Sequence, residues 1–124
     1  MKNIKNLKLS IGNYMNMEQF ELFDFTGDLK CNYIQTENMR RINYFYIVPE
    51  EYKIELLKFC DENNYFEDII SSNPEEIKEG GGVFSLSILL DNGTTIVKDV
   101  YENMPNNLTD FKKLLQQIIN NSTI

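Results

Sequence analysis

The strongest constraint on the fold is a pair of strand-like runs on either side of a tight-turn sequence. Residues 83–90 and 94–101 have the composition of strands and flank Asp91-Asn92-Gly93. Asparagine followed by glycine tolerates the positive φ angles of a primed two-residue turn. The segment is therefore predicted to form a β-hairpin, whose second strand is closed by Pro105.

Four further strand-like runs precede the hairpin, at residues 7–11, 19–25, 29–33 and 41–48. In the last of these, the alternation places Ile42, Tyr44, Tyr46 and Val48 on one face. Short turns join the runs, and strands connected in this way usually pair with their neighbours in sequence. These segments predict an antiparallel meander.

Two amphipathic segments are predicted to form helices that cover the sheet, and Ile54 belongs to the apolar stripe of the first one. Pro49 suits a first helical position, Glu50 and Glu51 suit the positive end of the helix dipole, and Asn63-Asn64 ends the first helix. Residues 107–120 repeat apolar side chains at helical spacing. Leu57 and Leu115 are expected in the core. A short third helix is predicted at residues 73–79, ending at the triple glycine at residues 80–82.

The predicted fold class is α+β. Two main helices pack on one face of an antiparallel sheet of about six strands, a meander plus a C-terminal hairpin. The 124 residues are 42% hydrophobic and 25% charged, which is typical of one globular domain, so residues 1–124 are expected to form a single domain.

The absence of histidine excludes several classes of site. No Ser-His-Asp or Cys-His nucleophile can be assembled. With only Cys31 and Cys60, one copy cannot build a four-cysteine or a mixed cysteine and histidine zinc site. Both cysteines lie among apolar residues and are expected in the core. We expect no catalytic residue, no metal site and no cofactor.

No run approaches the ~20 apolar residues that span a bilayer. Lys2, Lys5 and Lys8 lie near the start of the chain, but no apolar segment of a signal peptide follows them. The sequence therefore predicts a cytoplasmic protein with free thiols.

The net charge of −7 arises within one segment. Residues 50–79 hold ten acidic residues against Lys53, Lys58 and Lys78, and the acids elsewhere are balanced by bases. Such a field repels nucleic acid and anionic membranes, and it favours a basic protein partner. Tyr65 and Phe66 lie between two acidic pairs, as a hydrophobic anchor with a charged rim would. The predicted partner-binding residues are Glu50, Glu51, Glu55, Asp61, Glu62, Tyr65, Phe66, Glu67, Asp68, Glu75, Glu76 and Glu79.

Two other interpretations stay open. Paired carboxylates could serve a small acid–base or metal-dependent enzyme, although neighbouring residues on a helix diverge and the calcium-loop spacing is absent. Alternatively, the chain is a housekeeping domain whose acidic segment is only a solvated face.

The layout resembles the small acidic immunity proteins of bacterial polymorphic toxin systems. The likeness is carried by the acidic stretch from Pro49 to Glu79, by the hairpin at Asp91-Asn92-Gly93 and by the terminal helix with Phe111-Lys112-Lys113-Leu114-Leu115. The resemblance implies a non-enzymatic protein that blocks a basic partner, such as a toxin or a nucleic-acid-binding enzyme. Phage inhibitors that mimic nucleic acid have a similar composition.

Overall fold

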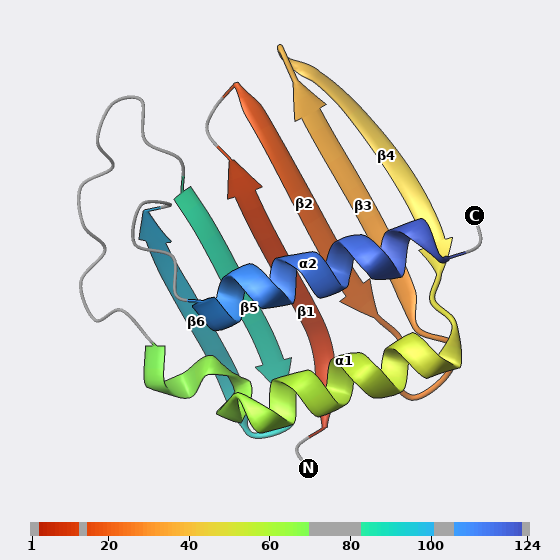
Figure 1. Cartoon of the computed structure of the whole chain (residues 1–124), viewed down its shortest axis with the longest axis vertical. Helices are drawn as coiled ribbons and strands as arrows, with labels where there is room; N and C mark the ends of the chain where they lie inside the picture. The colour runs from red at the N-terminus through yellow and green to blue at the C-terminus, as the bar shows by residue number, and fades with distance from the viewer. Residues whose placement is uncertain (1–2, 13–14, 70–82, 101–105, 123–124) are drawn as a thin grey trace.

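The computed structural model describes residues 3–12, 15–69, 83–100 and 106–122. It shows a six-stranded antiparallel sheet with two α-helices, which confirms the predicted α+β fold (Figure 1). The elements are β1 (Ile4–Gly12), β2 (Asn16–Phe23), β3 (Lys30–Glu37), β4 (Arg40–Ile47), α1 (Glu50–Glu62), the short helix η1 (Asn64–Ile69), β5 (Val83–Leu90), β6 (Gly93–Val100) and α2 (Asn106–Asn120).

The strand order is β4-β3-β2-β1-β5-β6, and every neighbouring pair is antiparallel. The first four strands form the predicted meander, and β5 and β6 form the predicted hairpin. Its turn differs from the predicted primed turn, because Leu90 pairs with Gly93 and positive φ occurs at Gly93 but not at Asn92. The hairpin adds beside β1, so that Leu9 pairs with Phe20 on one side and with Leu86 on the other. The first strand of the chain therefore lies inside the sheet.

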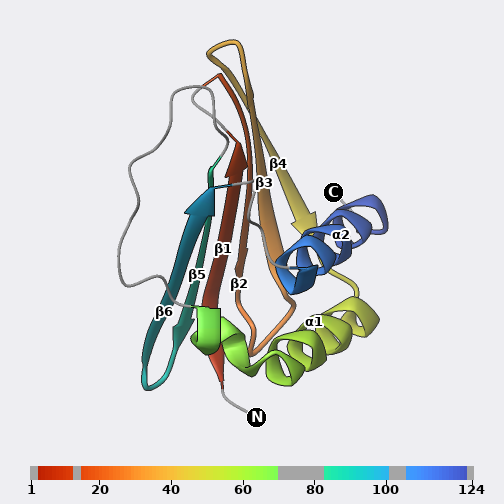
Figure 2. The same ribbon diagram turned by 60° about the vertical axis from the view of Figure 1, so that its left-hand side comes forward.

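Both helices lie on the same face of the sheet (Figure 2). The alternation in the strands turns residues such as Leu7, Phe20 and Leu86 towards them, and each of these side chains is fully buried. From α2, the buried residues are Leu108, Phe111, Leu114, Leu115 and Ile118. Cys31 and Cys60 are also buried and free, as predicted. One apolar layer between sheet and helices thus forms the core.

The strand ends differ from the prediction: β1 and β2 begin earlier, at Ile4 and Asn16, and β3 extends to Glu37, whereas β2 ends early where the backbone turns left-handed. The second strand was expected over residues 19–25, but it ends at Phe23 because Asp24 has φ 61°. Phe25 is buried from the following loop instead. Pro49 lies immediately before α1, one position earlier than expected. The helix predicted at residues 73–79 and the triple glycine lie outside the described residues.

The turn between β3 and β4 contains Asn38 and Met39 with φ 50° and 67°. Asparagine tolerates this left-handed conformation, whereas methionine is destabilised there by about 1–2 kcal/mol. Met39 is 91% exposed, so its side chain gains little packing in return.

Replacing Met39 with glycine is therefore expected to raise the free energy of unfolding by about 1 kcal/mol, because glycine adopts positive φ without a steric cost. Urea unfolding monitored by circular dichroism measures the change. The control is Met39→Ala, which removes the exposed side chain but keeps the Cβ atom and should gain nothing. Equal unfolding midpoints for the two variants would show that the turn is not strained.

Candidate functional site

The candidate site is built on helix α1, whose inner face is fixed by the core. Leu56 and Cys60 are buried on that face, with Tyr52 and Phe59 packed beside them. Pro49 opens the helix, and its carbonyl accepts hydrogen bonds from the backbone N–H groups of Tyr52 and Lys53. At the other end, the Asn63 side chain donates to the carbonyl oxygen of Phe59 over 2.9 Å. The helix is held at both ends and cannot rotate without exposing its apolar side chains.

The outer face of α1 carries most of its charge. At about 100° per residue, the positions remote from Leu56 and Cys60 fall on one side of the helix. All of their side chains are exposed. This acidic face, as we name it, consists of Glu50, Glu51, Ile54, Glu55, Lys58, Asp61 and Glu62. It presents five carboxylates against one lysine.

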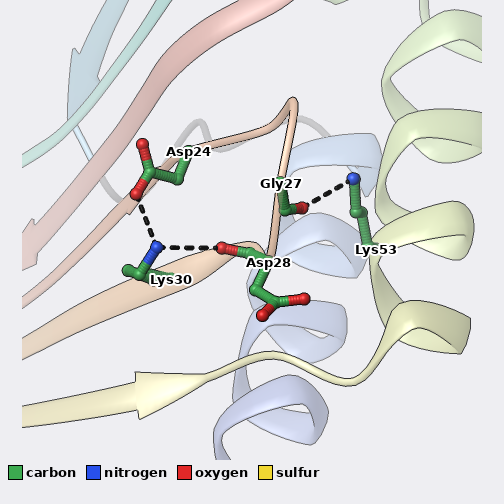
Figure 3. Close-up of polar contacts among 5 residues, drawn as sticks. All are labelled: Asp24, Gly27, Asp28, Lys30 and Lys53. Carbon is green, nitrogen blue, oxygen red and sulfur yellow. Dashed lines mark hydrogen bonds and ion pairs between the residues drawn. The ribbon is translucent and has the colours of Figure 1, made fainter.

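The lysines near α1 do little to neutralise these carboxylates. Lys53 reaches the loop between β2 and β3, where its ammonium donates to the Gly27 carbonyl oxygen over 3.0 Å (Figure 3). At the start of β3, Lys30 pairs with the carboxylate of Asp24 from the same loop over 2.6 Å. Lys58 lies on the face itself, 3.9 Å from Glu62, and an exposed pair at this distance contributes little stabilisation. The negative potential of the face is therefore largely uncompensated.

Ile54 is a candidate site residue that was not among the predicted ones. It was counted in the apolar stripe of α1, but its side chain is 59% exposed on the acidic face. Glu50 and Glu51 lie one turn before it and Lys58 lies one turn after it. Its spacing from Leu56 and Cys60, two and six positions, is the signal that could have placed it outward. An apolar side chain with a charged rim is the arrangement of an interface anchor.

Tyr65 and Phe66 were predicted as that anchor, and this prediction is wrong. Their side chains are 2% and 0% exposed. The ring of Phe66 lies 5.3 Å from that of Phe111, and the Tyr65 hydroxyl donates to an Asp61 carboxylate oxygen over 3.2 Å. Both residues therefore belong to the core and its margin.

The physical reason is the backbone after α1. Asn64, Tyr65 and Phe66 have φ 51°, 54° and 60°, so the chain makes a left-handed turn and directs both rings inward. Each bulky residue in this conformation is disfavoured by about 1–2 kcal/mol. Full burial of each aromatic side chain contributes about 1.5–3 kcal/mol. Burial outweighs the strain, and the turn persists.

Among the other five predicted acids, Glu67 is the one whose side chain the structure describes. Glu67 is half-buried in η1 and makes contacts of its own. Asp68 lies in η1, and its side chain is outside the described part of the structure, as are Glu75, Glu76 and Glu79. The structure thus assembles five of the ten predicted acids.

A concave region lies away from α1, between β2, β3 and α2. It is a pocket of about 300 Å³, with Glu18, Glu37 and Lys112 among its lining residues. Burial, the charge of Glu18 and a hydrogen bond with that carboxylate raise the pKa of Tyr33 to about 12. Of the predicted site residues that the structure describes, none lines this pocket.

In the portion of the chain that the structure covers, no three Asp, Glu, Cys or His side chains are grouped as metal ligands. No helix within those same ranges is long and apolar enough to cross a bilayer. No protein-family model matches the chain, and no curated protein matches it.

Proposed function

We propose that this chain is a non-enzymatic binding protein that docks its acidic face on a basic surface of another protein. By covering that surface it blocks the partner, as an immunity protein or an inhibitor does. One observation carries the proposal: five exposed carboxylates surround an exposed isoleucine on the outer side of a helix whose inner side is locked in the core.

Each part of the face has a distinct role in binding. The carboxylates create a field that attracts a basic surface before contact, which speeds association and rejects acidic proteins. Ile54 supplies the apolar contact that is desolvated once the surfaces meet. The partner class that fits is a protein with a lysine- and arginine-rich functional surface, such as a toxin or an enzyme that binds nucleic acid.

The test compares two double variants, each of which replaces two acidic residues with lysine. The two variants differ only in where these substitutions lie. Glu55→Lys with Glu62→Lys changes the acidic face, and both substitutions lie away from the first turn, where acids stabilise the helix dipole. The matched control is Glu37→Lys with Asp110→Lys, which changes the net charge equally at exposed positions on β3 and α2. The immobilised wild-type chain and both variants are exposed to native lysate at low salt, and retained basic proteins are identified.

A retained partner is expected to bind the control like the wild type. With the acidic-face variant, its association rate constant should fall by about tenfold or more at low salt, and the difference should shrink as salt rises. Ile54→Ala should act instead on dissociation, at about 1–2 kcal/mol. Equal binding by the two charge variants, or an association rate insensitive to salt, would refute the proposal.

A further inference from the structure

The outer edge of β4 is the most exposed strand edge that the structure describes with its side chains. β4 is the last strand in the sheet order, and its eight residues pair with β3 in an uninterrupted register. Among the described residues, no segment pairs with its other side. The backbone groups that point outward from β4 can therefore bind another strand.

Apart from Arg40 and Arg41 at its start, β4 lacks the features that usually protect an edge strand. Residues 42–47 read Ile-Asn-Tyr-Phe-Tyr-Ile, with no charge and no proline, and the register shows no bulge. Ile42, Phe45 and Ile47 are 49%, 43% and 45% exposed. By contrast, the sequence of the opposite edge strand, β6, includes Lys98 and Asp99. An uncharged edge of this kind favours association.

We propose that β4 pairs antiparallel with β4 of a second copy of this chain. The two sheets then form one continuous sheet, and a two-fold axis perpendicular to it passes near the middle of the strand pair. This symmetry places the helices of both copies on the same side of the joined sheet. Ile42, Phe45 and Ile47 of each copy become covered by the other.

The charges at the two ends of β4 specify a second copy as the occupant. Arg40 and Arg41, the chain's arginines, begin the strand, and Glu50 and Glu51 follow its end in the first turn of α1. All four side chains are exposed. In an antiparallel pair, the start of one strand runs beside the end of the other. The arginines of each copy then lie near the glutamates of its partner, once at each end of the strand pair. A parallel pair would place arginine beside arginine.

The proposed contact leaves most of the acidic face open. Ile54, Glu55, Asp61 and Glu62 lie further along α1 than the residues used in the strand pair. A dimer would therefore present two copies of this surface. The Glu55→Lys, Glu62→Lys variant should bind the basic partner more weakly but keep the wild-type dimer affinity. Failure of the proposed function and failure of the proposed dimer can therefore be distinguished.

The test is a charge swap followed by sedimentation equilibrium. The first variant carries Arg40→Glu and Arg41→Glu, and the second carries Glu50→Arg and Glu51→Arg. In each variant alone, like charges meet at both ends of the strand pair, and the dimer dissociation constant should rise by about tenfold or more. When the two variants are mixed, opposite charges meet at both ends, and a heterodimer should form with an affinity close to that of the wild type.

The heterodimer also shows that both variants are folded, and circular dichroism of each variant checks this independently. Ile42→Lys offers a second route, because it places a charge in the middle of the strand pair and should weaken the wild-type dimer. The proposal is overturned if the wild-type chain sediments as a monomer over the whole dilution series, which would leave the edge to a strand of another protein. It is also overturned if either charge variant alone dimerises like the wild type, or if mixing the two variants does not restore dimerisation.

Discussion

Replacement of Phe111 by alanine is expected to lower the free energy of unfolding by about 3–5 kcal/mol. Phe111 lies on the inner side of α2 with 0% exposure. Its ring centroid is 5.5 Å from that of Phe59 in α1 and 5.3 Å from that of Phe66 in η1. Truncation would remove the side chain that joins α1, η1 and α2, and the cavity could close only by moving a helix. Urea unfolding followed by circular dichroism measures the loss.

Leu57→Ala provides the comparison. Leu57 was expected in the core, but its side chain is only half-buried and lines an open pocket of about 400 Å³. Its truncation leaves less apolar surface unpaired, and the expected loss is below about 2 kcal/mol. An unfolding midpoint that Phe111→Ala does not move would contradict the packing of α2 described above.

The free energy of unfolding is expected to fall by about 2–3 kcal/mol between pH ~8 and pH ~10. Burial raises the pKa of the Cys31 and Cys60 thiols from 9.0 to about 12. Above pH ~9 the unfolded chain releases both protons, whereas the folded chain retains them until its own pKa near 12. The unfolded state therefore binds fewer protons in this window. Stability is full below pH ~9 and falls as the pH rises, by about 1.4 kcal/mol per unit for each thiol.

Urea unfolding under reducing conditions at several pH values tests this dependence. Cys31→Ala and Cys60→Ala lower stability at pH ~8 because each leaves a small cavity. Each variant should nevertheless lose only about half as much stability as the wild type on going to pH ~10. The window ends there because the pKa of Tyr33 is also raised, to about 12, and its phenol contributes the same slope above pH ~10. A wild-type stability that is constant across the window would show that the thiols are accessible to solvent.

Much of the fold could be predicted because the sequence signals are local. The turn residues Asp91-Asn92-Gly93 located the hairpin, although not its turn geometry, and α2 follows from an apolar repeat that matches the helical period. The position of β1 between β2 and β5 could not be predicted in this way. It depends on pairing between segments that are distant in sequence. The alternation of apolar residues along β1 distinguishes its two faces but does not indicate which strand pairs with which of its edges.

The acidic face was predicted better than its apolar centre. Exposure of Glu51, Glu55 and Glu62 follows from charge alone, since an unpaired carboxylate is rarely buried. Ile54 was misassigned because its hydrophobicity suggests burial, and only its angle around the helix indicates otherwise. Tyr65 and Phe66 were misassigned because their burial depends on left-handed backbone angles that bulky residues normally avoid.

The internal position of β1 has a consequence for synthesis on the ribosome. The four-stranded meander can pair as soon as it emerges, but the other side of β1 is completed only by β5. Gly12 pairs with Val83, 71 residues later in the chain. Until that segment leaves the exit tunnel, β1 is an unpaired edge strand of the nascent meander. Such an apolar edge is a target for chaperones and for misassembly between chains on neighbouring ribosomes.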